Sequence, residues 1–242
     1  MKTIFLNCSP KKKFSASSYF IFLQKLFIKG KKISLNLNSP YDYEKILSSI
    51  ENQDNLIFVL PLYVDALPSH VLPFLKKLEK LCKEKNLSLH VNTIINNGFI
   101  EGSQNKTALE IFENFCIRSN ITWQGGIGIG GGVMLNVTRI LFIVNLIFFV
   151  VNIIVNAINS NIYIFPNLLF DFLKIVFLLL FLNCGVLWYL IKMGFAINKK
   201  RFFGKKFTRI MLPSFVFIIF TNIFFTIISI IKGGFFKKWL KS

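Results

Sequence analysis

Short apolar segments alternate with amphipathic segments along the first half of the chain. Strands are predicted at about residues 2–7, 33–37, 56–60, 87–95 and 121–129. Apolar residues at helical spacing lie between them and predict helices over roughly 19–27, 43–50, 68–85 and 103–118. The segment LIFVL at 56–60 is continuously apolar, which is typical of a strand buried on both faces. This alternation predicts an α/β domain with a mainly parallel sheet.

Three long uncharged stretches follow, at 140–158, 175–191 and 210–231. A helix that crosses a bilayer needs about 20 apolar residues, with roughly 17–25 accepted. The second stretch reaches that length if it begins near residue 170. We therefore expect three transmembrane helices at about 138–158, 170–191 and 210–231, and a division of the chain into a soluble domain at 1–135 and an all-α membrane region at 136–242.

The predicted spans contain polar stripes. Asn145, Asn152 and Asn156 lie on one face of the first span. A similar stripe in the third span consists of Ser214, Thr221, Asn222, Thr226 and Ser229. Such residues either hydrogen-bond across packed helices or line a transport path. The lack of an ionisable residue in the middle of a span favours packing.

The charge distribution separates the same two regions. Hydrophobic residues make up 53% of the chain and charged residues only 17%. Residues 1–136 contain 16 Lys and Arg against 10 Asp and Glu, whereas residues 137–242 contain 13 against the single acid Asp171. Because the second set lies between apolar runs, it fits membrane topology and not a partner nucleic acid.

The short loops predict the orientation in the membrane. The loop at 159–170 has no Lys or Arg and is expected outside, whereas the loop at 192–209 contains seven and is expected in the cytoplasm, together with the N-terminal domain. Three full spans would put the four lysines of 232–242 outside, against the same rule. Either the rule fails at this tail, or the segment around Pro213 re-enters the membrane and returns.

Cysteines and the N-terminus give no sign of export. Cys8, Cys82, Cys116 and Cys184 are scattered without a CxxC pair, so we expect neither a disulfide framework nor a metal site. The apolar run at 3–6 is too short for a signal peptide.

Ligands of parallel α/β sheets bind past the carboxyl ends of the strands, where three loops lie here. These are 8–18 (CSPKKKFSASS), 61–69 (PLYVDALPS) and 96–104 (NNGFIEGSQ). The first combines hydroxyls and lysines with a helix N-terminus, which suits an anion. It matches neither a Walker A loop nor a dinucleotide fingerprint. Its serines could equally be helix caps.

Taken in order, these loops resemble those of the flavodoxin-like NAD(P)H-dependent FMN reductases of clostridial-type bacteria. Ser9-Pro10 with 15–18 (SASS) is similar to the FMN-phosphate loop of that family. The segments 61–65 and 67–69 resemble the loop beside the flavin ring, and 97–99 (NGF) resembles the third flavin loop. The resemblance covers about residues 1–135 and implies a doubly wound parallel sheet of order 2-1-3-4-5.

The resemblance also implies bound FMN and a set of cofactor-binding residues. The phosphate would be held by Ser9, Ser15, Ser17 and Ser18. The ring would be flanked by Pro61, Leu62, Tyr63 and Val64 on one side and by Asn97 and Gly98 on the other. The flavin would supply the redox chemistry, so no catalytic residue and no metal are expected from the chain. NAD(P)H as reductant and a homodimer are further implications of the family.

Together these features predict an FMN-dependent oxidoreductase anchored in the bacterial cell membrane, with its domain in the cytoplasm. Electrons would pass from NAD(P)H or another donor to a quinone, a membrane redox partner or a small acceptor. Anchoring raises the effective concentration near a membrane acceptor. Whether the chain is an enzyme stays open, because the same fold can serve as a binding or regulatory module without cofactor. A small transporter with a redox-sensing domain is a further alternative.

Overall fold

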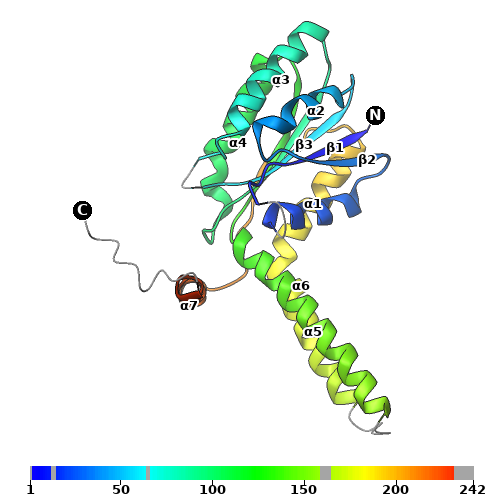
Figure 1. The fold of residues 1–242 in the computed structure, drawn as a ribbon, viewed down its shortest axis with the longest axis vertical. Coiled ribbons are helices and arrows are strands. Elements are labelled where there is room, and N and C mark those ends of the chain that lie inside the picture. Colours follow the sequence, from blue (N-terminus) through cyan, green and yellow to red (C-terminus); the bar gives the residue numbers. More distant parts are fainter. Residues whose placement is uncertain (1, 12–14, 64–65, 159–164, 232–242) are drawn as a thin grey trace, which may run out of the picture. The chain divides into compact units, whose positions relative to one another are not determined.

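The computed structural model describes residues 2–11, 15–63, 66–158 and 165–231. The chain divides into two compact units, Met1–Ile210 and Met211–Ser242. In the first unit, a six-stranded parallel sheet has the order β2-β1-β3-β4-β5-β6 (Figure 1). Its strands are β1 (Thr3–Asn7), β2 (Lys32–Asn36), β3 (Asn55–Pro61), β4 (His90–Asn96), β5 (Thr122–Ile129) and β6 (Gly204–Phe207).

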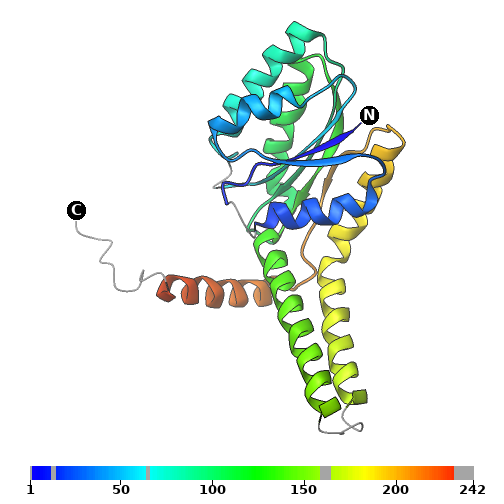
Figure 2. The ribbon, with the colours of Figure 1, turned by 45° about the vertical axis from the view of Figure 1, so that its right-hand side comes forward.

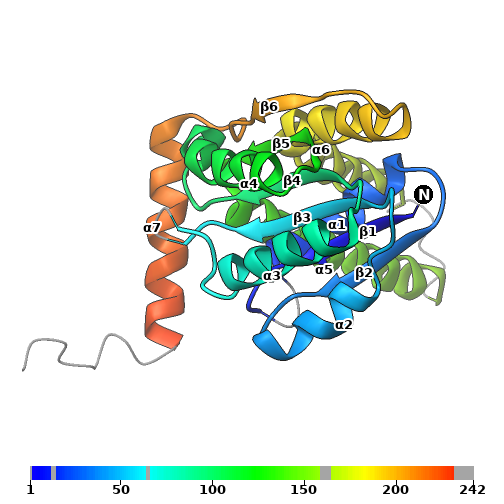
Figure 3. The same ribbon diagram turned by 90° about the horizontal axis from the view of Figure 1, so that it is seen from above.

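Helices cover both faces of this sheet (Figure 3). One face packs against α2 (Tyr43–Ser48), α3 (Val71–Lys85) and α4 (Lys106–Arg118). The other face is covered by α1 (Ala16–Phe27) and by part of α6 (Phe165–Asn198). Short 3₁₀ turns at Pro40–Asp42 and Gly102–Asn105 precede α2 and α4. This is the doubly wound arrangement with the flavodoxin-like order 2-1-3-4-5, extended by one strand, and it confirms the predicted fold class.

The core between the sheet and α2–α4 consists of alternate strand residues. Phe58 on β3 lies between Phe74 of α3, at a ring-centroid distance of 6.3 Å, and Phe112 of α4, at 5.0 Å. All three side chains are fully buried. Because aromatic rings bury large apolar areas, this cluster joins both outer helices to the centre of the sheet.

The first two apolar helices form a hairpin that begins directly after β5 (Figure 2). They are α5 (Gly132–Ile158) and α6, which pack on each other through Phe149 and Phe172, stacked at a ring-centroid distance of 4.4 Å. Both are long and apolar enough to cross a membrane, as is α7 (Ser214–Ile231) in the second unit. Three such helices among the described residues suggest a membrane protein, and three were expected from the sequence.

The C-terminal half of α6 belongs to the α/β domain. Its inner face consists of side chains at heptad-like spacing, and each of them is at most 2% exposed: Val186, Leu190, Met193 and Ile197. The helix approaches α1 so closely that a methyl group on Gly194 would lie 2.6 Å from Phe27 Cβ. The 34 residues of α6 span about 51 Å at 1.5 Å per residue, far more than a bilayer core of about 30 Å. The hairpin is therefore an insertion in the α/β fold. It lies between β5 and the C-terminal half of α6, which covers the sheet.

The sixth strand was not predicted. Gly204–Phe207 pairs in parallel with Gly125–Gly128 of β5. An ion pair from Lys205 Nζ to Glu113 Oε2 of α4, at 2.6 Å, holds it in place. Residues 199–210 thus lie on the same side of the hairpin as the N-terminal residues.

Two of the three asparagines of α5 that were predicted to bond across helices, Asn145 and Asn152, bond within their own helix instead. Asn145 Nδ2 donates to Leu141 O, and Asn152 Nδ2 donates to Phe148 O, each at 2.8 Å within α5. These amides are satisfied by carbonyls four residues earlier in their own helix.

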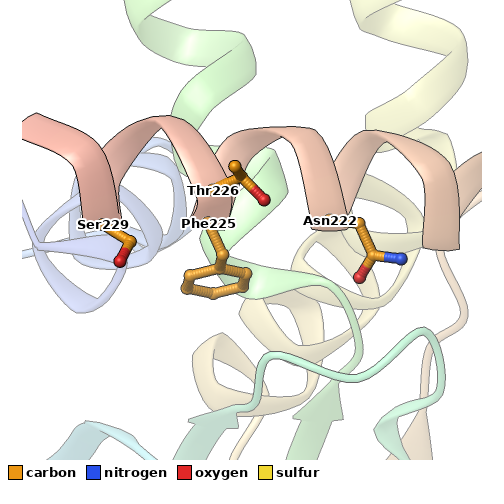
Figure 4. A pocket seen from close by; sticks show the side chains of 4 residues that line it. All are labelled: Asn222, Phe225, Thr226 and Ser229. Atoms are coloured by element: carbon orange, nitrogen blue, oxygen red, sulfur yellow. The ribbon is translucent and has the colours of Figure 1, made fainter. Parts of the chain in front are cut away.

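The second unit contains α7, which begins after Pro213, whose carbonyl accepts from the Phe217 N–H at 3.0 Å. One side of α7 has a shallow hollow lined by Asn222, Phe225, Thr226 and Ser229 (Figure 4). Three of these residues belong to the polar stripe predicted from the sequence.

Candidate functional site

The candidate site lies at the carboxyl ends of β1, β3 and β4, where the order of the strands reverses. Backbone bonds join the loops that leave these strands. Cys8 N donates to Val59 O at 2.9 Å, and Leu62 N donates to Asn96 O at 2.7 Å. His70 Nε2, at the start of α3, lies 3.1 Å from Cys8 O. The three predicted loops therefore meet at one edge of the sheet, as expected for parallel strands.

The loop after β1 is organised by local hydrogen bonds of its serines. Ser9 N donates to Asn7 Oδ1, and Ser9 Oγ accepts from Lys11 N, both at 3.3 Å. Ser15 is the N-cap of α1, since its Oγ accepts from Ser18 N at 3.1 Å. The cap interpretation therefore holds for Ser15, and it leaves the positive end of the α1 dipole at the site.

The side chains of the other two serines, Ser17 and Ser18, bond to different parts of the protein. Ser18 Oγ donates to Ser15 O at 2.7 Å, near the beginning of α1. Ser17 is 1% exposed, and its Oγ accepts from Asn96 Nδ2 at 3.4 Å. Ser17 thus binds the loop after β1 to the end of β4, and its hydroxyl faces the protein interior.

The loop after β3 makes a tight turn. Tyr63 and Ala66 exchange two backbone hydrogen bonds of 2.9 Å. Pro61 ends β3, the Leu62 side chain is buried, and Tyr63 is 42% exposed. Val64, predicted as a neighbour of the flavin ring, lies outside the described residues. Tyr63 is the exposed aromatic side chain of this segment.

Tyr63 also connects the loops after β1 and β3. Partial burial raises the pKa of its phenol, and a side-chain hydrogen bond with Ser9 lowers it in part. A phenol with a raised pKa is neutral at physiological pH, so this aromatic wall adds no negative charge to the edge of the sheet.

The loop after β4 contains the third predicted pair. Asn97 is 2% exposed; its Nδ2 donates to Glu101 O, and its backbone N–H donates to Ile129 O, both at 3.0 Å. Gly98 is exposed, and a methyl group added to it would meet no atom within 4 Å. Phe99 beside it is 50% exposed. This loop leaves open space at Gly98, where a planar group has room.

Asn96 is a central residue of the site that the sequence analysis did not single out. Its Nδ2 donates to Leu60 O at 2.9 Å as well as to Ser17. Its side chain also lies against Gly132, the first residue of α5. Asn96 thus joins β3, α1 and the start of the apolar hairpin. The available signal is an asparagine directly after an apolar strand, which the sequence analysis places in the loop 96–104.

The arrangement fits a flavin mononucleotide in its chemistry. A helix N-terminus with hydroxyls suits a phosphate, and Lys11 belongs to the same loop. Tyr63 and Phe99 are exposed aromatic side chains on the loops after β3 and β4, and Gly98 beside Phe99 borders open space. Such walls suit a flat aromatic ring. Ser18 is partly exposed and Tyr63, Gly98 and Phe99 are exposed, whereas Ser9, Ser15, Ser17, Leu62 and Asn97 are buried.

In comparisons with known proteins, the chain is similar only to solved structures. No family model and no curated protein matches the chain. The Trp repressor binding protein of Bacillus subtilis is 13% identical, with a TM-score of 0.42 over 52% of this chain and 81% of that one. An NADPH-quinone reductase from P. pentosaceus is 12% identical, with a TM-score of 0.43 over 54% and 86%. An azoreductase from Bacillus anthracis is 11% identical, with a TM-score of 0.37 over 54% and 87%.

Proposed function

We propose that this chain is a membrane-anchored, flavodoxin-like oxidoreductase that binds FMN. The observation that supports it is that the α1 N-terminus, the exposed Tyr63 and the open space at Gly98 belong to loops that meet at the switch point of the sheet. FMN would supply the redox chemistry when bound. The chain would hold the phosphate at the first turn of α1, through the backbone amides and Ser18, with Ser15 as the cap of that turn.

The remaining residues would position the ring. Tyr63 on one loop, and Asn97 and Gly98 on another, would lie on its two sides. Ser9 and Ser17 would support them indirectly, since Ser9 bonds to Tyr63 and Ser17 to Asn96. NAD(P)H or another donor would reduce the flavin.

The acceptor that fits best is a quinone or another partner in the membrane. The apolar hairpin begins at Gly132, against Asn96, which closes the same edge of the sheet. A ligand at this edge would therefore lie near the base of the hairpin. Anchoring of this kind raises the effective concentration of flavin and membrane acceptor for each other.

We further propose that the domain faces the cytoplasm of a bacterial cell. The segment 199–209 is rich in Lys and Arg, and through β6 it lies on the same side of the hairpin as the domain. Short basic loops of this kind stay on the cytoplasmic side. The loop between α5 and α6, which lacks Lys and Arg, would then be outside.

The test is the visible spectrum of the full chain purified in mild detergent, with identification of any flavin released on heating. We expect flavin absorption and about one FMN per chain, and bleaching by NADH or NADPH that a quinone reverses. A colourless protein that also fails to take up added FMN would contradict the proposal. The inward direction of Ser17 and Leu62 would then favour the second candidate, a flavin-free module that binds a partner.

A further inference from the structure

One side of α1 is apolar and exposed. Phe20, Ile21 and Gln24 face the sheet and are at most 6% exposed. Phe22 and Leu26, on the opposite side of the helix, are 60% and 62% exposed. A surface helix normally has polar residues on its outer face, so this pair indicates that the outer face of α1 has a partner.

The outer face of α1 lies next to the base of the hairpin. Tyr19 lies in the same row as Phe22 and Leu26, at i, i+3 and i+7. Its Oη donates to Asn183 Oδ1 of α6 at 3.2 Å, and the guanidinium of Arg139 of α5 lies 5.4 Å from the centroid of its ring. The exposed row therefore begins where the two apolar helices leave the domain. The sheet face that α1 covers is also the face from which the hairpin extends (Figures 1 and 3).

The length of the hairpin places its base, where Tyr19 contacts Asn183, at the edge of a bilayer. Asn183 Nδ2 lies 3.5 Å from Thr138 Oγ1, so Asn183 and Thr138 are at the same height. Residues 139–158 of α5 span about 30 Å at 1.5 Å per residue, which is the thickness of the hydrocarbon core. The polar cluster of Tyr19, Thr138, Arg139 and Asn183 then lies at the headgroups, and the outer row of α1 lies beside it.

The charged residues in the sequence around α1 have one sign. The first 41 residues contain eight lysines and no Asp or Glu. Lys11 precedes α1, and Lys29 and Lys31 follow it, all three exposed. Apolar side chains between clusters of lysine are typical of helices that lie in the interface of an anionic membrane.

We propose that α1 lies on the surface of the membrane that the hairpin spans, with Phe22 and Leu26 in the interface and Lys29 and Lys31 at anionic headgroups. The inference rests on the proposed membrane anchoring. It gives the domain a second attachment besides the hairpin, and it holds the N-terminus of α1, where the cofactor phosphate would bind, at the membrane surface.

The test uses the full chain with Cys184 replaced by Ser, because Cys184 is the exposed cysteine among the described residues. Single cysteines that carry an environment-sensitive fluorophore are placed by Phe22→Cys, by Leu72→Cys on α3 and by Val144→Cys on α5. Leu72 is 46% exposed and Val144 55% exposed. Each protein is reconstituted in vesicles of phosphatidylglycerol and phosphatidylcholine, with and without nitroxide-labelled lipid.

We expect the labels at 22 and 144 to be quenched by the nitroxide lipid and the label at 72 to be unaffected. If 144 is quenched and 22 behaves like 72, the anchoring stands and the proposed contact of α1 is wrong. If 144 is not quenched either, the anchoring itself is wrong and the inference falls with it. A label at 22 that is shielded from water in detergent but insensitive to nitroxide lipid would show a protein partner instead.

A charge-reversal pair tests the lysines separately. In the Phe22→Cys protein, Lys29→Glu with Lys31→Glu should lower the quenching at 22 in anionic vesicles, because the glutamates repel phosphatidylglycerol. Lys76→Glu with Lys85→Glu on α3 makes the same change in charge on the other face of the sheet and should leave the quenching as it was. Equal quenching in the two charge variants would contradict the role of the headgroups.

Discussion

Gly132 lies directly against the side chain of Asn96, so that a methyl group on Gly132 would come within 2.7 Å of both Cβ and Oδ1 of Asn96. The first residue of the apolar hairpin is therefore packed on the residue that joins β3, β4 and α1. No side chain larger than hydrogen fits between them without displacing the Asn96 amide from Leu60 O and Ser17 Oγ.

This contact predicts opposite results for two glycines of the same edge. Gly132→Ala should destabilise the protein by about 1–3 kcal/mol, the usual cost of overpacking, and should weaken flavin retention. Gly98→Ala should leave stability unchanged, because its methyl group would enter open space. Thermal unfolding and flavin content of both variants check this, and equal stability of the two would contradict the packing of Asn96 on Gly132.

Ser15 allows a test of the phosphate site that leaves α1 capped. Aspartate is as good an N-cap as serine, so Ser15→Asp should keep the fold. Its carboxylate would repel a phosphate at the same helix terminus, and FMN should be lost. Ser15→Ala is the matched control: it should cost about 1 kcal/mol of stability through the lost cap and retain the flavin. A folded Ser15→Asp protein with full flavin content would overturn the assignment.

The hydrogen bond between Tyr19 and Asn183 should couple α1 to the hairpin. Asn183 is 5% exposed, and Tyr19→Phe would leave its Oδ1 without this donor. We expect a loss of about 1 kcal/mol for Tyr19→Phe. The double variant with Asn183→Leu should be less destabilised than the sum of the single changes. Thermal midpoints of the four proteins in the same detergent measure the coupling, and strict additivity would show that the bond contributes nothing.

Three buried thiols predict a loss of stability at alkaline pH. Burial raises the pKa of Cys8 and Cys116, and it raises the pKa of Cys82 to about 11. Because an unfolded thiol ionises near pH 8.5, the unfolded state binds fewer protons above that pH, and stability falls as the pH rises toward 11. Cys82→Ala should show a shallower decline of the thermal midpoint between pH 8 and 10.5 than the parent protein. Parallel declines would contradict the prediction.

A fragment ending at residue 135 should not fold as a soluble domain. It would lack the helix that buries Val186, Leu190, Met193 and Ile197, each worth about 1.5–3 kcal/mol of apolar burial. Joining 1–131 to 183–210 through a short Gly/Ser linker restores this cover and β6, and should give a soluble monomer. Size-exclusion chromatography compares the two proteins. A monomeric, cooperatively unfolding 1–135 fragment would show that the cover is dispensable.

The sequence was sufficient for the elements with regular patterns. The five strands of the predicted sheet begin and end within three residues of their observed bounds. Each predicted apolar span lies mainly within one observed helix, although α5 begins six residues earlier and α6 extends five residues before and seven residues after its predicted span. By contrast, β6 was missed because its four residues, GKKF, have no apolar periodicity. Pairing with β5 and the ion pair from Lys205 to Glu113 form this strand, and both are tertiary contacts.

That the C-terminal half of α6 covers the sheet could not be predicted, for a different reason. The helix is apolar on all sides, so hydropathy cannot distinguish the part that faces lipid from the part that faces the sheet. At the candidate site, the positions of the loops could be predicted from the ends of the strands. The directions of Ser17 and Leu62 could not, because they depend on the phase of α1 and on the backbone bond from Leu62 to Asn96.

The interruption of the α/β fold by the hairpin has a consequence for synthesis. As the chain leaves the ribosome, β1–β5 and α1–α4 are complete before the helix that covers the sheet beside α1 exists. That cover becomes available only after α5 and the first half of α6 have emerged, which in a membrane protein is when the hairpin enters the bilayer. A nascent domain with an uncovered sheet face is prone to aggregation and degradation. Maturation of the domain would thus be tied to successful insertion, so that chains which fail to reach the membrane never complete a functional site.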